Sequence, residues 1–301
     1  MASAETFSFL TYDDIWHDAE RGRAIPIRLR LPDTNTAQNV SSKLPLIVFS
    51  HGLGGSLASG SFWLDHWASH GFATLNVQHP GSDFHIWSRA KNPTQPNLRE
   101  RLQQAMQPSE LVARAGDVRF VLDTLTTKQH DQQDHFKQLD LQRIGMSGHS
   151  YGAVTTLALC GQYYPHLPEL HADDAPSKLF DARIRAGLAL SPSARNTNNL
   201  AEQFGRITMP FFCLTGTHDQ IGIAPEITPA NRQLPHQYMQ GDNKSMLVLD
   251  GADHLFFNGR SRQDSAAECG LAGFKQTDNP VDANLIPIVN ARTLAFWQAN
   301  L

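Results

Sequence analysis

The pentapeptide Gly148–Gly152 places the tightest constraint on how this chain of 301 residues can fold. It reads Gly-His-Ser-Tyr-Gly; residues 141–147 before it are typical of a short strand, and residues 153–160 after it of a buried helix. At a sharp strand-to-helix turn, side chains at the two glycine positions would collide with the neighbouring strand and helix. A serine in a structural glycine-rich turn is the alternative, which the flanking elements disfavour. We therefore predict a nucleophile elbow with Ser150 at its tip.

Apolar segments of strand length alternate with helical patterns over most of the chain. Residues 7–31 hold two extended segments, and residues 25–31 alternate apolar and polar as in a half-buried strand. Further strands are expected at 44–50, 72–77, 184–190, 210–215 and 244–249. Helical spacing of apolar residues occurs at 62–70, 110–125 and 283–299. The alternation predicts an α/β protein with a mostly parallel, doubly wound sheet flanked by helices, in a single domain over residues 1–301.

Irregular excursions interrupt this alternation at residues 79–107, 161–182 and 220–243. The first is rich in Pro, Ser, Asn and Gln, which favour loops. Open parallel sheets bind ligands at the carboxyl ends of their strands, so we expect the excursions to cap that edge and shape a pocket. Trp87 and Phe84 are candidates for the pocket wall, although aromatic residues in loops as often pin the loop to the protein.

The composition is that of a globular protein with a large core. Hydrophobic residues make up 41% and charged residues 18%, which argues against disorder. A net charge of −4 without a basic run gives no reason to expect nucleic acid or a membrane surface as partner. No run approaches the ~20 apolar residues of a membrane span, and residues 1–6 lack the pattern of a signal peptide. We therefore expect a cytoplasmic protein, although a secreted protein that had lost its signal peptide would look the same.

The signals for metal or redox chemistry are weak. The three cysteines, Cys160, Cys213 and Cys269, do not form a disulfide framework, and the first two lie in apolar runs typical of a core. The segment His130–His135 could be called a metal site, but a solvated loop between helix and strand is the better interpretation. We expect neither a metal nor a cofactor.

Polar residues follow several predicted strands at the point where each strand ends. Ser150, Asp219 and His254 hold such positions, and so does His51-Gly52. Because the carboxyl ends of parallel strands meet at one edge of a sheet, we expect these residues to assemble there. His254 would take the serine proton and later return it to a leaving alcohol. Asp219 would hold the imidazole in the required tautomer.

Each assignment has a less specific alternative. Asp219 could be an ordinary turn residue, and Asp250 and Asp253 compete for its role; its place at the end of the strand before the histidine strand favours it. The chain contains 14 histidines, so chance proximity is a concern, but His254 directly follows the last predicted strand.

A tetrahedral intermediate at Ser150 would need hydrogen-bond donors for its oxyanion. The backbone N–H of Tyr151, directly after the serine, is one candidate, and the N–H of Leu53 is the other. Losing one such donor typically costs about 100- to 1,000-fold in rate. We expect His51 to fix the Leu53 loop by hydrogen bonding, and His149 to pack beneath the elbow without taking part in proton transfer.

Together these motifs resemble the α/β-hydrolase superfamily. The resemblance is carried by the segments Ser50–Gly55, Gly148–Gly152, Thr217–Asp219 and Ala252–His254. Within the superfamily the chain is most similar to the serine esterases grouped with the platelet-activating-factor acetylhydrolases and predicted dienelactone hydrolases, to which Trp16–Pro26 and His79–Ser82 are also similar. The resemblance implies Ser150, Asp219 and His254 as catalytic triad, with Leu53 and Tyr151 as oxyanion donors. True dienelactone hydrolases use a cysteine nucleophile, so Ser150 argues against that substrate.

The leading hypothesis is a cofactor-free hydrolase of small to medium carboxylic esters, including short-acyl lipids, that works through an acyl-Ser150 intermediate. A polyester hydrolase of the cutinase type or a phospholipid-type hydrolase is the alternative, and either would prefer aggregated substrate. Peptidase and thioesterase activity use the same machinery. A non-catalytic ligand-binding member of the fold is a further alternative, which the intact Ser-Asp-His set disfavours. The acyl chain length, the leaving group and the oligomeric state do not follow from the sequence.

Overall fold

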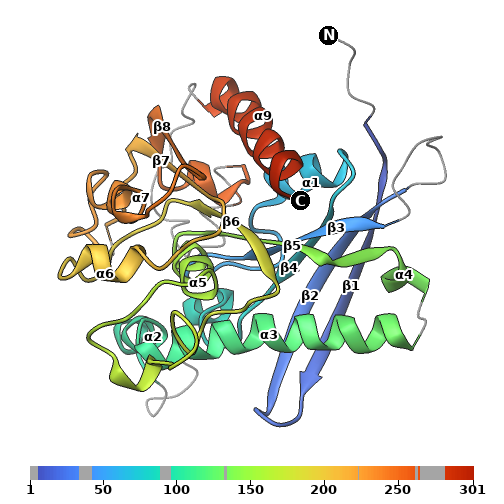
Figure 1. Cartoon of the computed structure of the whole chain (residues 1–301), viewed down its shortest axis with the longest axis horizontal. Coiled ribbons are helices and arrows are strands. Elements are labelled where there is room, and N and C mark those ends of the chain that lie inside the picture. The colour runs from blue at the N-terminus through green and yellow to red at the C-terminus, as the bar shows by residue number, and fades with distance from the viewer. Residues whose placement is uncertain are drawn as a thin grey trace.

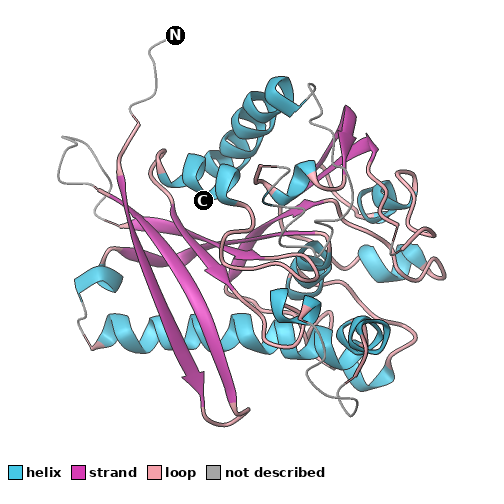
Figure 2. Cartoon of the chain, turned by 180° about the vertical axis from the view of Figure 1, so that it is seen from behind, coloured by secondary structure: helices cyan, strands magenta, loops and turns pink. Residues whose placement is uncertain are grey.

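A twisted sheet with helices on both faces forms the centre of the molecule (Figures 1 and 2). The computed structural model describes residues 6–33, 43–88, 96–131, 134–222, 224–261, 264 and 282–301. Within these ranges the strands form an eight-stranded sheet in the order β1-β2-β4-β3-β5-β6-β7-β8. The β1–β2 and β2–β4 pairs are antiparallel, and every pair from β4 to β8 is parallel. The predicted α/β-hydrolase fold is therefore confirmed.

The strands are β1 (Phe9–Asp18), β2 (Arg23–Pro32), β3 (Leu44–Ser50), β4 (Ala73–Val77), β5 (Leu139–His149), β6 (Ile184–Leu190), β7 (Phe211–His218) and β8 (Lys244–Asp253). The α-helices are α1 (Ser61–Ala68), α2 (Leu98–Ala105), α3 (Pro108–His130), α4 (Asp134–Lys137), α5 (Tyr151–Leu159), α6 (Leu200–Phe204), α7 (Leu234–Tyr238) and α9 (Asp282–Asn300). Short 3₁₀ turns are η2 (Phe84–Trp87), η3 (Pro168–Leu170), η4 (Asn231–Gln233) and η5 (Phe256–Asn258).

Two apolar layers sandwich the sheet, and β3 shows how the sequence builds both. Its seven residues are all buried. Leu46 and Val48 pack into the layer formed with α3 and α5, whereas Ile47 and Phe49 pack into the layer formed with α1 and α9. Successive side chains of a strand point to opposite faces, so a strand covered on both sides is apolar throughout.

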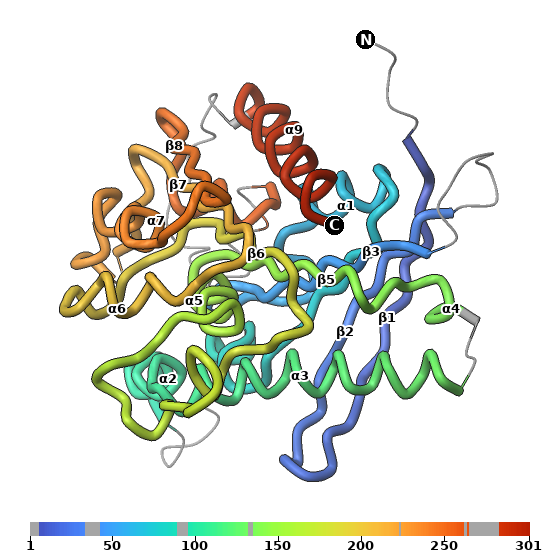
Figure 3. Tube along the Cα trace, viewed as in Figure 1, coloured from blue at the N-terminus to red at the C-terminus, as the bar shows by residue number. Residues whose placement is uncertain are grey.

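The antiparallel β1–β2 hairpin forms one edge of the sheet. It is longer than the neighbouring strands and extends past α3, as the trace in Figure 3 shows. On the face of the sheet opposite α3 and α5, α9 packs against α1. Trp67 and Trp297 meet there edge to face, with ring centroids 5.6 Å apart. None of the helices in the described ranges combines the length and apolar character needed to cross a membrane.

The excursions contain more regular structure than the sequence pattern predicted. Residues 79–107 include η2 and the helix α2, and residues 220–243 include η4 and α7. Helix α2 begins with a capping box, in which the Asn97 side chain accepts from the Glu100 N–H and the Glu100 carboxylate accepts from the Asn97 N–H. This Asn-x-x-Glu signal was present in the sequence, but the surrounding polar residues obscured it. Residues 89–95 lie outside the described part of the chain.

The prediction that His130–His135 is a solvated loop is also partly wrong. His130 is the last residue of α3, and His135 lies in α4, where its ring is 5.7 Å from the ring of Tyr12. Residues 132–133 lie outside the described ranges. In the part of the chain that the structure describes, no group of three or more His, Cys, Asp or Glu side chains is arranged to hold a metal ion.

Candidate active site

Ser150 lies at the tip of a strained turn between β5 and α5. Its φ of 54° and ψ of −112° are outside the regions that L-residues favour, and its N–H donates to the Leu190 carbonyl of β6 at 2.9 Å. A Cβ at Gly148 would lie 2.3 Å from the Gly152 oxygen, and a Cβ at Gly152 would lie 1.8 Å from the Ser50 oxygen. The glycines are therefore required by close backbone approach, as the pentapeptide predicted.

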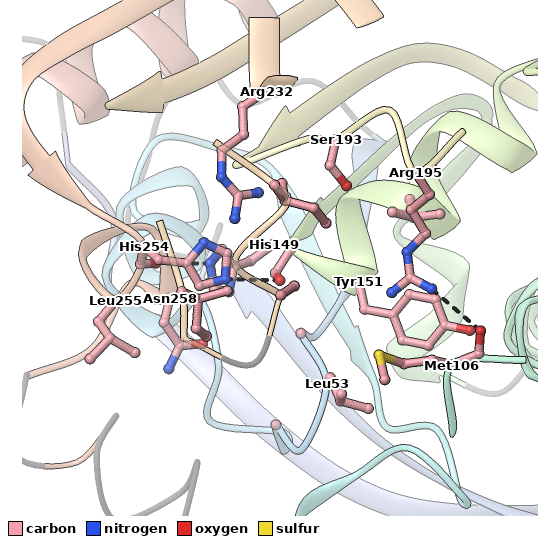
Figure 4. Close-up of a pocket in the computed structure, with 17 residues that line it drawn as sticks. Leu53, Met106, His149, Tyr151, Ser193, Arg195, Arg232, His254, Leu255 and Asn258 are labelled. Atoms are coloured by element: carbon pink, nitrogen blue, oxygen red, sulfur yellow. Dashed lines mark hydrogen bonds between the residues drawn. The ribbon is translucent and has the colours of Figure 1, made fainter. Parts of the chain in front are cut away.

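Ser150, His254 and Asp219 form a continuous chain of hydrogen bonds at the carboxyl edge of the sheet. The His254 Nε2 lies 2.9 Å from the Ser150 Oγ, and the His254 Nδ1 lies 2.7 Å from the Asp219 Oδ1. Asp219 and His254 are buried, whereas Ser150 is half-buried and borders a cavity (Figure 4). The carboxylate accepts from Nδ1–H, so the Nε2 lone pair faces the serine hydroxyl, which is the tautomer a general base needs.

Three side chains that the sequence analysis did not assign hold the Asp219 carboxylate. The Ser191 hydroxyl donates to Asp219 Oδ2 and also lies 2.9 Å from the His254 Nδ1. The Thr215 hydroxyl donates to the same Oδ2 at 2.7 Å. The buried Arg232 guanidinium lies 2.8 Å from Oδ1 and also donates to the Asp219 and Ser191 carbonyls. The carboxylate is thus oriented by bonds at both oxygens.

This arrangement sets the protonation states of the two central groups. Burial alone would raise the pKa of Asp219, but the hydrogen bonds from His254 and Ser191 and the charges of His254 and Arg232 lower it to about 2. Burial lowers the pKa of His254 below its usual 6.5, and Arg232 adds to this effect, while Asp219 opposes it. At neutral pH the pair is therefore an ionised carboxylate and a neutral imidazole, ready to accept a proton.

The predicted oxyanion donors face the same cavity. Leu53 and Tyr151 both line it, and neither backbone N–H donates to another residue in the described ranges. His51 fixes the Leu53 loop: its Nδ1 lies 2.6 Å from the Gly52 carbonyl, and its Nε2 accepts from the His79 N–H at 3.0 Å. Together these contacts leave the two N–H groups available for a ligand oxygen.

His149 packs behind His254. Its Nε2–H donates to the His254 carbonyl at 3.0 Å, and the two rings lie 4.8 Å apart at a tilt of 43°. Burial, with a smaller effect from the neighbouring His254, keeps the pKa of His149 well below its ordinary value. A neutral His149 therefore supports the position of His254, and its single proton is engaged with the His254 carbonyl.

The structure does not place Trp87 or Phe84 in the cavity beside Ser150. The Trp87 Nε1 donates to the Gly54 carbonyl at 3.1 Å, and its ring fills the space that a Cβ at Gly54 would occupy. Phe84 is 42% exposed. Trp87 thus braces the loop that carries Leu53, while the cavity walls come from other residues: Met106, Val154, Ile221, Ile227 and Leu255.

Comparison with known proteins places the chain in a family. A dog platelet-activating factor acetylhydrolase is 22% identical over 295 residues, covering 89% of this chain; the chain spans 59% of that relative's length. A ferulic acid esterase from Streptomyces cinnamoneus superposes with a TM-score of 0.56 at 16% identity, covering all of this chain and 91% of the other. A puromycin-hydrolyzing peptidase from Mycobacterium tuberculosis gives 0.59 at 16% identity, covering all of this chain and 40% of the other.

At a sequence identity of 16%, the likeness to these two solved structures shows a common fold alone. The sequence model described as "Platelet-activating factor acetylhydrolase, isoform II" matches residues 28–259, which is most of the chain. The match includes the elbow, Asp219 and His254. The chain therefore belongs to the platelet-activating factor acetylhydrolase isoform II family.

Proposed function

We propose that this protein hydrolyses carboxylic esters of short acids through an acyl-Ser150 intermediate. The observation that carries the proposal is the hydrogen-bond chain from Ser150 through His254 to Asp219, which begins at a strained serine bordering a cavity. Membership of an acetylhydrolase family supports the same reaction class. A binding protein would gain nothing from holding a serine at a costly φ beside a neutral imidazole.

Acylation begins when the Ser150 Oγ attacks the carbonyl carbon of the ester and His254 Nε2 takes the hydroxyl proton. The new charge of the imidazolium is stabilised by Asp219, which stays ionised. The carbonyl oxygen becomes an oxyanion and accepts hydrogen bonds from the N–H groups of Tyr151 and Leu53. The intermediate then collapses: the bond to the alcohol oxygen breaks, and His254 gives its proton to the departing alcohol.

Deacylation uses the same groups with water as nucleophile. The water oxygen attacks the acyl-Ser150 carbonyl while His254 takes one of its protons, and the oxyanion forms again at the same two donors. When the bond to Oγ breaks, the proton returns from His254 to Ser150. The sum of both stages is one ester and one water converted to one acid and one alcohol.

The size of the cavity supports short acyl groups. The cavity beside Ser150 has a volume of about 60 Å³. A single water molecule needs roughly 10–15 Å³ of such space, so the cavity has room for a few water molecules or a group of a few heavy atoms, such as an acetyl. Its walls are mostly apolar, which fits an acyl chain rather than a charged group at this point.

The test is a series of 4-nitrophenyl esters from acetate to decanoate, measured with the wild type, Ser150→Ala and Ser147→Ala. Ser147 is the matched control, because it lies in β5 and its buried Oγ has no hydrogen-bond partner in the described residues. We expect Ser150→Ala to lower kcat by about 10,000-fold or more, and Ser147→Ala to keep it within about 3-fold. The rate should be highest for the shortest acids. Wild-type activity in Ser150→Ala would refute the mechanism, and a preference for decanoate would refute the assignment to short acids.

A further inference from the structure

A second cavity adjoins the one beside Ser150. It has a volume of about 220 Å³, several times that of the first, and is bounded on its far side by Tyr164, His166 and Leu167. The two cavities share a wall formed by Met106, Tyr151, Val154, Ser193 and Arg195. The two spaces therefore lie next to each other, and a substrate that reaches from Ser150 into the second space must pass these five residues.

Arg195 is a cation in this wall without an acidic partner. It is exposed, it forms no ion pair with a described residue, and its Nη1 lies 3.4 Å from the Met106 carbonyl, a long hydrogen bond. The other arginine that lines the first cavity, Arg232, is already paired with Asp219. No Asp or Glu occurs among the described residues that line either cavity. The wall is thus cationic, although the whole chain carries a net charge of −4.

The position of Arg195 is fixed by the ring of Tyr151. The guanidinium carbon of Arg195 lies 4.7 Å from the ring centroid, and that of the buried Arg114 lies 4.6 Å from the same centroid. Figure 4 shows Arg195 beside this ring. A guanidinium that stacks on an aromatic ring keeps the N–H groups of its edge free for two parallel hydrogen bonds. The two like charges also repel each other, which a bound anion would relieve.

The Tyr151 side chain supplies a second, independent indication. It is 3% exposed, it lines both cavities, and its hydroxyl has no hydrogen-bond partner in the described part of the protein. Burial raises the pKa of this phenol, so it is a neutral donor at physiological pH. A buried hydroxyl without a partner is costly and indicates a ligand atom that accepts its hydrogen bond.

We propose that Arg195 binds a carboxylate of the substrate in the second cavity, so that the preferred esters carry a carboxylate on their acyl or alcohol part. A carboxylate can accept two parallel hydrogen bonds from the edge of one guanidinium. The Tyr151 hydroxyl provides a further donor for it. A phosphate dianion would call for further cations, and Arg195 is the unpaired cation among the described lining residues. The inference rests on the proposed function, since it names the substrate class of that site.

The experiment compares matched pairs of esters that differ in one charge. For the acyl side, mono-4-nitrophenyl adipate is paired with its primary amide; for the alcohol side, 4-acetoxybutanoate is paired with 4-acetoxybutanamide. Acetoxyethyl phosphate provides a phosphate arm. The measured quantity is the ratio of kcat/KM for the acid to that for the amide, in wild type, Arg195→Gln and Arg195→Lys. Arg185→Gln is the control, because Arg185 is exposed and lies at the opposite end of β6.

We expect the wild type to favour the acid of at least one pair, and Arg195→Gln to lower that ratio by roughly 10-fold, a value for an exposed charged hydrogen bond. Arg195→Lys should keep part of the preference for the acid, and Arg185→Gln should keep all of it. Added salt should reduce this preference in the wild type. The responding pair identifies the side that carries the carboxylate. An unchanged ratio in Arg195→Gln overturns the proposal, and so does a response confined to the phosphate ester.

Failure of the proposed function gives a different result. In that case no ester is turned over in a Ser150-dependent way. The subsite is then tested by calorimetric binding of adipate to the full chain. Binding by the wild type that is lost in Arg195→Gln supports the carboxylate site, and equal or absent binding in both overturns it.

Discussion

One Ser–His–Asp hydrogen-bond chain borders the cavity, and a second chain of the same composition lies buried next to the loop that follows β3. We call the first the elbow chain; it consists of Ser150, His254 and Asp219. We call the second the buried chain; it consists of Ser50, His79 and Asp117. In the buried chain the Ser50 Oγ lies 2.9 Å from the His79 Nε2, and the His79 Nδ1 lies 3.1 Å from the Asp117 Oδ2. By these distances alone the two chains are nearly the same.

What separates them is the state of the serine. Ser50 is fully buried at the end of β3; its Oγ accepts a hydrogen bond from the Arg114 Nη2 at 2.9 Å, and its proton is engaged with the His79 Nε2. Ser150 is half-buried, is held at a φ of 54°, and lines a cavity together with Leu53 and Tyr151, whose backbone N–H groups donate to no residue in the described ranges. Access, backbone strain and the proposed oxyanion donors therefore distinguish Ser150, the proposed nucleophile, from a structural serine of equal geometry.

The carboxylates differ in what their arginines do. Asp117 lies 2.7 Å from the Arg23 Nε and 3.0 Å from the Arg21 Nη1, and these pairs join the β1–β2 hairpin to α3. Asp219 lies 2.8 Å from the Arg232 Nε, which also holds the backbone after β6. The arginines around Asp117 thus connect the hairpin to α3. Arg232 instead holds Asp219, which is the hydrogen-bond partner of His254. The contrast predicts that the same substitution lowers activity at Asp219 and stability at Asp117.

The largest expected difference is between Asp219→Asn and Asp117→Asn. An amide at 219 cannot hold His254 in the required tautomer, so we expect kcat for 4-nitrophenyl acetate to fall by roughly 1,000- to 10,000-fold. An amide at 117 weakens the charged hydrogen bonds of the buried carboxylate to Arg23 and His79, so we expect a loss of about 2 kcal/mol in the free energy of unfolding by urea, with kcat of the folded protein within about 10-fold. Equal losses of kcat in the two folded variants would show that the buried chain takes part in the chemistry.

The elbow chain could be predicted from the sequence because its members obey one rule. Ser150, Asp219 and His254 each follow the end of a parallel strand, and the sheet alone brings such positions together. Ser191 follows β6 in the same way, so the rule could have included it. Arg232 could not be found, since it reaches Asp219 from η4 inside an excursion whose path no periodicity determines.

The buried chain was hidden from the sequence for a different reason. Arg114 and Asp117 lie in α3, where polar residues between apolar ones are usually taken for a solvated helix face. In the structure both are buried, because the loop after β3 supplies the His51 carbonyl as an acceptor for Arg114 and the hairpin supplies Arg23 as the ion-pair partner of Asp117. Trp87 shows the same limit: its contact with Gly54 depends on the fold of a loop, so its role as a brace did not follow from its residue type.

For the buried chain we expect a smaller effect at low pH, namely a decrease in the free energy of unfolding. Burial and the charge of Arg114 lower the pKa of His79 from 6.5 to about 4, although Asp117 opposes this. Between these two pH values the unfolded chain binds a proton at His79 that the folded protein does not. His79 therefore causes no loss in the free energy of unfolding above pH 6.5. As the pH falls to 4, this group lowers that free energy by on the order of 3 kcal/mol. Urea unfolding at pH 7 and 4.5 measures the loss.

The matched variant for this prediction is His79→Gln, which keeps a neutral hydrogen-bonding side chain and removes the titration. Its free energy of unfolding at pH 7 should be lower than that of the wild type, because contacts to Ser50 and Asp117 are weakened. Its loss between pH 7 and 4.5 should be smaller than the wild-type loss. If both proteins lose the same amount, His79 is not the group responsible.

The smallest expected effect is a shift in the pH profile of the elbow chain. Since burial lowers the pKa of His254, the acid limb of kcat/KM should have its midpoint below pH 6.5, with activity lost as the imidazole is protonated at lower pH. The charge of Arg232 contributes to this lowering, so Arg232→Met should move the midpoint to higher pH. Arg232→Lys retains a positive charge near Asp219 and should move it less. A midpoint that is the same in the wild type and Arg232→Met would mean that burial alone sets the basicity of His254, and that Arg232 only orients Asp219.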